Sequence, residues 1–223
     1  MKGGGRESKA ESPPQPLAGP GSSALLVVIS APSGGGKTTL CQQLLAARPG
    51  MTRAVTCTTR PVREGERDGV DYYFLDPATF GKRLQAGHFI EHATVYGHSY
   101  GVLKSELLGK LRQGRDVLLN VDVQGAATIR ARAGQDPELK RALVMVFLTP
   151  PSLAEIERRL TTRATDSRAV IQKRLGVARQ EIGQWKHFDY LLISASVKED
   201  LRRMLAIVEA EKTRSSRMSP PEI

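Results

Sequence analysis

The sequence predicts an α/β domain in which a parallel sheet is covered by helices. Two observations support this fold class. Four apolar runs rich in strand-forming residues occur along the chain, and each is followed by a segment whose apolar residues have helical spacing. The length of 223 residues suits one domain with a sizeable core. Strands that alternate with helices favour a parallel sheet with helices on its faces.

The first apolar run, ALLVVIS at 24–30, is continuous, as expected for a strand buried on both faces. The helix that follows it contains Leu40, Leu44 and Leu45 at helical spacing and ends before Pro49. The other three predicted strands are VLLNVDV at 117–123, ALVMVFL at 142–148 and YLLIS at 190–194.

Capping-box spacing marks the start of two later helices. Ser152 precedes Glu155 by three residues, and Ser196 precedes Glu199 in the same way. In such a box the hydroxyl accepts a hydrogen bond from a backbone N–H that the helix itself leaves unpaired.

Two interruptions break the alternation. In the first, RAVTCTTR, DYYFL and HFIEHATVYG predict short strands, with one helix that begins at Asp76-Pro77. The second is helical and basic. We therefore predict a domain at 24–213 that carries an inserted, partly antiparallel lobe at about 54–104 and a helical lid at about 152–184. The remaining segments, 1–23 and 214–223, are predicted to be tails.

Several classes of protein are disfavoured by composition. No apolar run approaches the ~20 residues that a membrane-spanning helix needs, and the first 23 residues lack the apolar stretch of a secretory signal. Cys41 and Cys57 have no His or Cys neighbours at metal-ligand spacing, which argues against a zinc site or a disulfide framework. A reducing, cytoplasmic setting is the expectation.

The net charge of +10 raises the alternative of a nucleic-acid binder. Much of the excess is local, since residues 140–180 contain nine Lys or Arg against three acids. This segment has few aromatic residues on which bases could stack. A basic arm that folds over a polyphosphate explains the same charge, and a solvated helix surface is the simpler alternative.

The stretch ISAPSGGGKTTL at 29–40 has the order strand, glycine turn and helix. A loop of this kind directs several backbone N–H groups to one point at the positive end of a helix, where an anion can bind. Lys37 adds a charge, and the Thr38 hydroxyl can hold Mg²⁺. Ala31 occupies the first glycine position of the usual phosphate-loop pattern, and alanine is tolerated there if its φ is negative.

Asn120 and Asp122 follow at the end of the second long strand. Because side chains alternate along a strand, the sequence predicts that both point to the same face. Asp122 supplies a carboxylate, of the kind that commonly fixes a metal-bound water beside a phosphate loop, whereas Asn120 brings no charge.

Arg60 and Arg63, in TCTTRPVR, are candidates for a second anion site. Guanidinium groups suit phosphate because they are planar, permanently charged and fork-shaped. A solvated, charged turn is the alternative for this motif.

Over nearly all of residues 24–210 the chain resembles the guanylate kinases. The resemblance depends on an ordered set of segments: SAPSGGGKT, TTRPVREGERDGVDYYF, FIEHATVYGHSYG, NVDVQG, TPPSLAEIERRLTTRATDS and IQKRL. It implies a P-loop parallel sheet with flanking helices, an inserted GMP-binding lobe and a helical lid. It also implies transfer of the terminal phosphoryl group of ATP to GMP, or to dGMP, with Mg²⁺ as cofactor. The expected partners are these small molecules alone, with no nucleic acid and no membrane, and the chain is expected to be a monomer or a homodimer.

The resemblance also assigns residues. The catalytic set is Lys37, Arg60, Arg163 and Arg174. The ATP site is Ala31, Pro32, Ser33, Gly34, Gly35, Gly36, Lys37, Thr38, Thr39, Arg159 and Arg163. The GMP site is Thr56, Arg60, Arg63, Tyr72, Glu91, Tyr100, Gly101 and Asp122. Thr38 and, through water, Asn120 are the expected metal ligands.

Physical chemistry supports Glu91 independently. Guanine presents two adjacent donors, N1–H and the exocyclic amine, to which an ionised carboxylate can pair. Adenine would place an acceptor at N1 against the same carboxylate. Sites that leave buried polar groups unpaired reject the wrong ligand by factors of ~10⁴.

Three departures from the family pattern leave alternatives open. Asn120 stands where an aspartate is usual, Val102 replaces a hydroxyl that normally touches guanine, and Ser194 and Ala195 replace an Asn-Asp pair near the adenine. One alternative is therefore a binding module with the same fold and little turnover. Another is a kinase for a different monophosphate, against which Glu91 argues.

Overall fold

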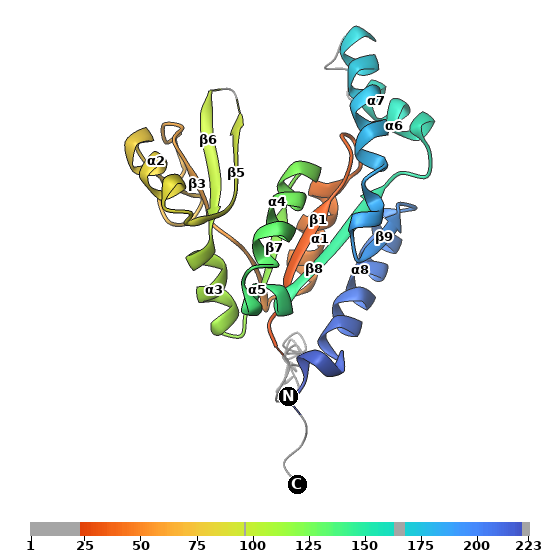
Figure 1. Cartoon of the computed structure of the whole chain (residues 1–223). Helices are drawn as coiled ribbons and strands as arrows, with labels where there is room; N and C mark the ends of the chain where they lie inside the picture. Colours follow the sequence, from red (N-terminus) through yellow and green to blue (C-terminus); the bar gives the residue numbers. More distant parts are fainter. Residues whose placement is uncertain (1–22, 96, 163–167, 220–223) are drawn as a thin grey trace, which may run out of the picture.

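The computed structural model describes residues 23–95, 97–162 and 168–219. Its core is a parallel sheet in the order β2-β7-β1-β8-β9 (Figure 1). The strands are β1 (Leu26–Ser30), β2 (Met51–Arg53), β7 (Asp116–Asn120), β8 (Leu143–Thr149) and β9 (Tyr190–Ile193). Every pairing in this sheet is parallel, so the carboxyl ends of its strands meet at one edge.

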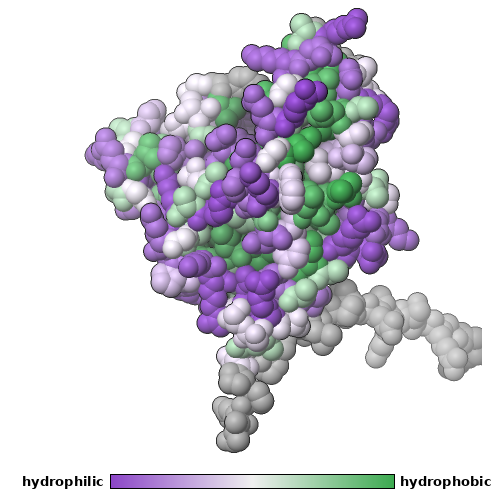
Figure 2. Space-filling view, turned by 45° about the vertical axis from the view of Figure 1, so that its right-hand side comes forward, coloured by the Kyte–Doolittle hydropathy of each residue, from purple (hydrophilic) through white to green (hydrophobic). Residues whose placement is uncertain are grey.

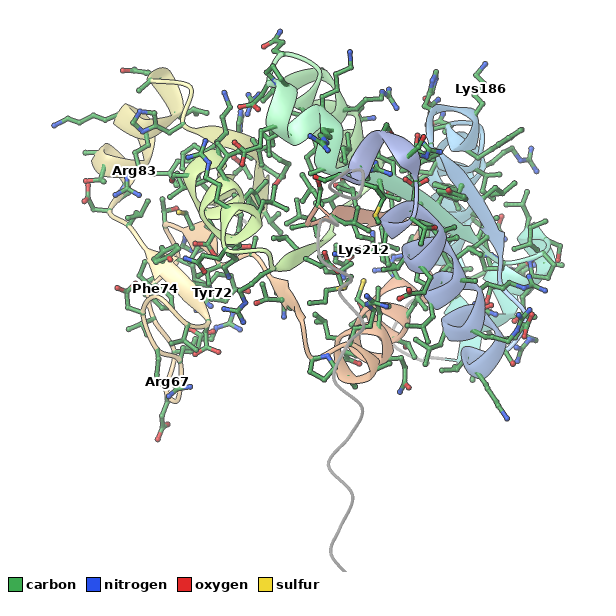
Figure 3. The ribbon with its side chains drawn as sticks, turned by 90° about the horizontal axis from the view of Figure 1, so that it is seen from below. Arg67, Tyr72, Phe74, Arg83, Lys186 and Lys212 are labelled. Atoms are coloured by element: carbon green, nitrogen blue, oxygen red, sulfur yellow. The ribbon has the colours of Figure 1, made fainter. Side chains whose placement is uncertain are left out.

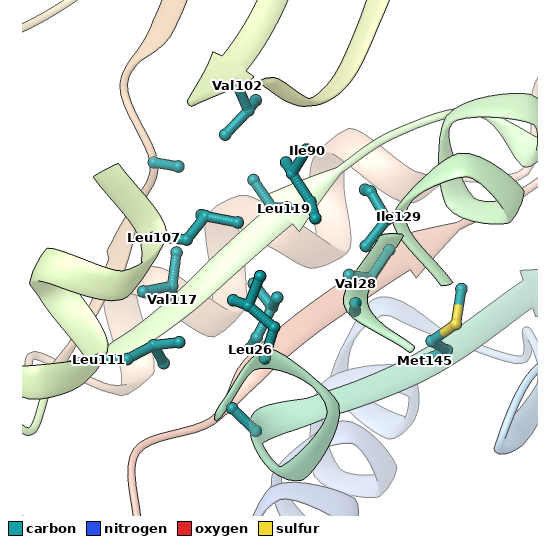
Figure 4. Close-up of a cluster of buried hydrophobic side chains, with 14 of the residues drawn as sticks. Leu26, Val28, Ile90, Val102, Leu107, Leu111, Val117, Leu119, Ile129 and Met145 are labelled. Atoms are coloured by element: carbon teal, nitrogen blue, oxygen red, sulfur yellow. The ribbon is translucent and has the colours of Figure 1, made fainter. Parts of the chain in front are cut away.

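Helices cover both faces of this sheet. Helices α1 (Lys37–Ala47) and α8 (Val197–Lys212) pack on one face, and α3 (Lys104–Arg112), α4 (Val123–Ala133) and α5 (Pro137–Ala142) pack on the other. Along β1, the side chains of Leu26 and Val28 pack with α3, α4 and α5 in one apolar cluster (Figure 4). Val27 and Ile29 pack with α1 and α8 in a second cluster on the other face, and all four side chains are fully buried. The prediction of a strand buried on both faces is confirmed.

The lobe is a second sheet in the order β4-β3-β6-β5. Its strands are β3 (Thr56–Thr58), β4 (Tyr72–Phe74), β5 (Phe89–Val95) and β6 (His98–Leu103), and α2 (Pro77–Gln85) packs on it. Strand β3 pairs with β4 in parallel and with β6 antiparallel, as the partly antiparallel prediction requires. Asp76 caps α2, because its side chain accepts a hydrogen bond from the Thr79 N–H at 2.9 Å.

Two details of the lobe differ from the sequence prediction. The segment RAVTCTTR is not one strand, because Arg53 ends β2 in the core sheet whereas Thr56 begins β3 in the lobe. The segment after β5 contains a further strand, β6, which the sequence analysis did not predict. Short polar strands at a turn carry too little periodicity to fix such boundaries.

The lid consists of α6 (Leu153–Thr162) and α7 (Arg168–Ile182), which share an apolar cluster that includes Ile156 and Leu160. Lobe and lid rise on opposite sides of the carboxyl edge of the core sheet (Figure 1). Two short 3-10 turns, η1 (Trp185–His187) and η2 (Ser215–Arg217), complete the described elements.

The surface in Figure 2 is mainly hydrophilic, with hydrophobic residues in patches between the charged ones. Of the helices that the structure describes, none combines the length and the apolar character needed to cross a bilayer.

Candidate functional site

The glycine loop joins β1 to α1 and surrounds a cavity of about 270 Å³, which we term the loop cavity. It is lined by residues 31–39 together with Asp122 and Glu181. Gly36 lies just before the helix with φ of 90°, a conformation that side chains disfavour. Gly35 is also required, since a Cβ there would lie 2.8 Å from the Ala31 Cβ and 2.9 Å from the Pro32 oxygen. The methyl group of Ala31 thus fits because residue 35 has none.

Lys37, the first residue of α1, points across the loop cavity. Its ammonium donates a hydrogen bond to the Val121 carbonyl at 2.8 Å. Burial lowers the pKa of Lys37, while the nearby carboxylates of Asp122 and Glu181 oppose that shift. The side chain therefore places its terminal nitrogen beside the glycine loop, where an anion would bind.

Glu181, near the end of α7, was missed by the sequence analysis. It accepts a hydrogen bond from the Ser33 N–H at 3.2 Å, so the lid touches the loop directly. Burial raises the pKa of Glu181. No local pattern distinguishes this glutamate from other acids on a helix, because its contact exists only once the lid is docked.

The lid also packs on the loop through side chains of α6. A Cβ on Gly34 would lie 3.4 Å from Leu160, and one on Gly36 would lie 3.6 Å from the Arg159 guanidinium. The Arg159 Nε donates a hydrogen bond to the carboxylate of Glu155, one turn earlier in α6, at 2.7 Å. The structure thus brings Arg159 to the loop, as predicted.

The two other predicted lid arginines have different outcomes. Arg174 lies in α7, and it is not among the residues that line the loop cavity in the described chain. Arg163 lies outside the described residues. Part of the basic excess at 140–180 belongs elsewhere, because Lys140 and Arg141 are in α5, ahead of β8. The attribution of the whole excess to a phosphate-covering arm was wrong for those two.

A side cavity of about 280 Å³ adjoins the loop between α1 and the start of α8. It is lined by Gly36, Thr39, Leu40, Arg159, Ser194, Ala195, Ser196, Val197 and Asp200. The buried Ser194 hydroxyl donates to Asp200 at 2.7 Å, and the Ala195 N–H donates to the same carboxylate at 2.9 Å. Asp200 therefore organises the segment where the family pattern has its Asn-Asp pair.

A third cavity, of about 250 Å³, lies between the lobe and the core sheet, and we term it the lobe cavity. Its lining comprises Arg53, Ala54, Thr56, Glu91, Tyr100, Val102, Leu118, Leu119, Asn120, Val121 and Asp122. Val102 is paired with Thr56 on one side and with Glu91 on the other. Thr56, Val102 and Glu91 thus form a row across three strands. Val102, which replaces the hydroxyl residue of the family pattern, is at the centre of this row.

Glu91 is largely buried, and its environment disfavours the charged form. Burial is the main reason that its pKa is raised to about 7, with repulsion from Asp122 adding to the shift and attraction to Arg132 opposing it. A carboxyl group with a pKa near neutral, in a cavity, is typical of a functional site.

The arginine part of the lobe site is already paired within the chain. Arg60 donates to Glu66 at 2.7 Å and to the Pro61 carbonyl at 2.6 Å, and its side chain is only 10% exposed. The Arg60 guanidinium lies over two aromatic rings, 5.4 Å from the centroid of Tyr72 and 5.9 Å from that of Phe74. These two side chains are neighbours on the lobe (Figure 3). Glu66, six residues after Arg60 in the motif, is a partner that the sequence analysis overlooked.

Other predicted lobe residues surround this pair. The Tyr72 and Tyr100 rings meet edge to face at 6.2 Å. Arg63 is exposed, and its backbone N–H donates to Glu66 at 2.8 Å. Gly101 is buried, and a Cβ there would lie 2.7 Å from the Phe89 ring. Packing against Phe89 is thus a reason for glycine at that position.

The placement of Asn120 and Asp122 differs from the prediction. Strand β7 ends at Asn120, and Asp122 caps α4, because its side chain accepts a hydrogen bond from the Gly125 N–H at 2.8 Å. The expectation that both residues alternate along one strand was therefore wrong. Both still line the lobe cavity, and Asp122 also lines the loop cavity.

Comparison with known proteins gives a consistent result. A family model described as guanylate kinase matches residues 23–211. The chain is 42% identical to guanylate kinase of Syntrophotalea carbinolica over 194 residues, 87% of this chain and 89% of that protein. It is 40% identical to guanylate kinase of Novosphingobium aromaticivorans over 195 residues, 87% of this chain and 86% of that protein. The crystal structure of guanylate kinase from Anaplasma phagocytophilum is similar, with a TM-score of 0.64 and 31% identity over 88% of this chain and 90% of that chain.

Proposed function

This chain belongs to the guanylate kinase family, and on that premise we propose that it transfers the γ-phosphoryl group of ATP to GMP, giving ADP and GDP. The enzyme would serve purine nucleotide metabolism and recycling of GMP. The proposal assigns ATP to the loop and side cavities and GMP to the lobe cavity.

The observation that carries this proposal is that the loop and lobe cavities share a wall. Asp122 lines both of them. Lys37 reaches from the loop to the Val121 carbonyl, and Val121 itself lines the lobe cavity. A phosphate in the loop cavity and a nucleotide in the lobe cavity would therefore lie on opposite sides of this wall, which the Lys37 ammonium contacts. A binding module for a single ligand has no need of two such adjoining sites.

In this arrangement the protein aligns donor and acceptor and neutralises charge, which is most of what phosphoryl transfer requires. The loop amides and Lys37 would hold the phosphates of ATP, and Arg159 would add positive charge from the lid. Arg60, Arg63, Tyr72 and Tyr100 would hold the phosphate of GMP. Thr56 and Glu91 would bind its base, with Asp122 nearby. Arg163 and Arg174 are proposed to come into contact with the phosphates when the lid closes, which also excludes water.

Mg²⁺ is the proposed cofactor. Thr38 is exposed in the loop cavity and Asn120 is exposed at the end of β7, so both offer oxygen atoms, the ligands that this cation prefers. Thr38 would bind the ion directly and Asn120 through water. When bound, the ion would neutralise charge on the phosphate oxygens.

The role of Asn120 can be tested with Asn120→Asp. If the missing charge weakens metal binding, this variant should reach half of its maximal rate at a several-fold lower Mg²⁺ concentration, because a carboxylate attracts the ion more strongly than an amide. A Mg²⁺ titration of ADP release at saturating nucleotides measures this. An unchanged requirement would mean that the charge of Asp122 suffices.

The function itself is tested by ADP release from Mg-ATP with GMP, dGMP, AMP, CMP and UMP in turn. The proposal expects turnover with GMP, and with dGMP if the 2′-hydroxyl is not read, and little with the others. Binding of GMP without ADP release would instead support the module with little turnover. Preference for AMP would show that Glu91 does not select the base.

We further propose a cytoplasmic location, action as a monomer or homodimer, and no nucleic-acid partner. Duplex DNA that stays bound at physiological salt would contradict the last point, because non-specific binding of phosphates weakens steeply with salt.

A further inference from the structure

A charged residue of the core, outside the residues that would touch either nucleotide, contacts the base of the lobe. Arg132, in the last turn of α4, donates a hydrogen bond to the Phe89 carbonyl of β5 at 2.6 Å. Glu91, the proposed guanine ligand, lies two residues further along the same strand. The contact therefore acts on the backbone from which Glu91 projects.

The backbone at this point is irregular. The pairing of β5 with β6 shifts register between Phe89 and Glu91, which is the geometry of a β-bulge. Phe89 packs in the lobe cluster, while Ile90 is fully buried in the core cluster near Leu119 and Ile129 (Figure 4). The three successive side chains of Phe89, Ile90 and Glu91 therefore lie in the lobe cluster, the core cluster and the lobe cavity. The shape of the bulge thus decides where Glu91 points.

Helix α4 touches this bulge at both of its ends. At its start, a Cβ on Gly125 would lie 3.3 Å from the Glu91 Cγ, and Asp122 places a negative charge nearby. At its end, Arg132 lies near enough to Glu91 to oppose the rise in the pKa of that carboxyl. Arg53, from β2, is the other charged residue that lines the lobe cavity with Glu91 and Asp122.

We propose that Arg132 is a positioning residue for guanine selection. It holds the Phe89 carbonyl so that the bulge directs Glu91 into the lobe cavity, and it offsets the negative charge of Asp122. Arg132 does not line that cavity, so it acts on GMP through Glu91. The inference rests on the function proposed above and names a further residue on which its selectivity depends.

The first experiment compares steady-state kinetics of Arg132→Gln with the unsubstituted protein. We expect the KM for GMP to rise roughly tenfold, the change that corresponds to loss of one hydrogen bond to a charged group. The kcat and the KM for ATP should stay within about twofold, since the loop cavity is untouched. Arg132→Lys keeps a donor and a charge, so it should recover part of the lost affinity.

Arg130→Gln is the matched control. Arg130 lies in the same last turn of α4, but it donates to the His187 carbonyl at 2.8 Å, away from the bulge. The KM for GMP should be unchanged in this variant. A thermal unfolding midpoint for each variant shows whether the fold is intact. If Arg132→Gln does not fold, Arg132→Lys takes its place with a smaller rise in KM.

The decisive readout is a double-mutant cycle with Glu91→Gln. If Arg132 acts through Glu91, its substitution should change the KM for GMP by less than about twofold once Glu91 is replaced. An equal rise in both backgrounds, or no rise in the presence of Glu91, would overturn the inference. Failure of the unsubstituted protein to phosphorylate GMP would instead overturn the proposed function, so the two failures are distinguishable.

Discussion

The loop cavity and the lobe cavity are built in different ways. The first is lined mainly by the glycine loop, residues 31–39, and little space is left beside Gly35, which faces Ala31, and beside Gly34, which faces Leu160. The second is lined by side chains that include Glu91, which lies near the competing charge of Asp122. Arg60, which is paired with Glu66, lies on the lobe but does not line this cavity.

This difference indicates which of the two sites can distinguish one nucleotide from another. A backbone loop offers the same N–H groups to the phosphates of any nucleotide, so it does not distinguish one base from another. A side-chain site can distinguish one base from another, but its charged groups need partners when the ligand is away. We therefore expect the loop to be sensitive to changes of shape and the lobe to be sensitive to changes of charge.

The largest effect is expected from Gly35→Ala. The added methyl group would overlap Ala31 and the Pro32 oxygen, so the loop would have to shift away from the geometry that holds the phosphates. We expect kcat to fall by a factor on the order of 10² or more, comparable with loss of a well-placed donor. Turnover at saturating GMP and ATP measures this.

The control for that substitution is Gly109→Ala in α3, where an added Cβ meets nothing within 4 Å. It should leave turnover unchanged and stabilise the fold by about 0.5–1 kcal/mol, because alanine favours a helix. Full activity in Gly35→Ala would show that the loop is not shape-limited.

A smaller but pH-dependent effect is expected at Glu91. GMP needs the ionised carboxylate, so binding is complete above the pKa of about 7 and is lost as the pH falls through it. The kcat/KM for GMP, which reports the free enzyme, should decline towards a slope of about tenfold per pH unit below 7. In Glu91→Gln this bend should disappear, and the remaining pH dependence is that of the GMP phosphate itself. A bend that persists in this variant would assign the titration to another group.

A modest effect is expected from Glu66→Gln. Glu66 holds the Arg60 guanidinium with one oxygen and the Arg63 N–H with the other, so its loss should loosen the phosphate site. We expect the KM for GMP to rise several-fold, as for about 1 kcal/mol of hydrogen bonding. A fall in KM would be equally informative, because it would mean that Glu66 competes with the phosphate.

The smallest effect is expected from Ala31→Gly, which restores the usual first glycine of the loop. The substitution removes one buried methyl group, at about 0.8 kcal/mol, and leaves the neighbouring Gly35 its space. Turnover should remain within about twofold, while thermal unfolding shifts to a slightly lower temperature. A large gain in turnover would show that the alanine strains the loop.

Much of the site could be predicted from sequence because its parts are local. Gly34 to Lys37 are neighbours in the chain, and a strand followed by a helix fixes their geometry. Arg60 and Arg63 are also near neighbours in the chain, in the segment between β3 and β4. Glu181 could not be found in this way, since it reaches Ser33 across 148 positions through lid docking. Asp122 was predicted on a strand because the alternation of side chains along VLLNVDV continues through it. In the structure it instead caps the start of α4.

The sequence by itself determined the alternation of strands and helices, the anion loop, and the presence of two inserted segments, because apolar periodicity and glycine stereochemistry act between near neighbours. Tertiary structure alone decided that Asp122 stands between two cavities, that Val102 lies between Thr56 and Glu91, and that Arg132 reaches the base of β5. Those relations join residues that are far apart in the sequence. The burial and the charge around each of them are set by side chains that become neighbours only when the sheets and helices pack.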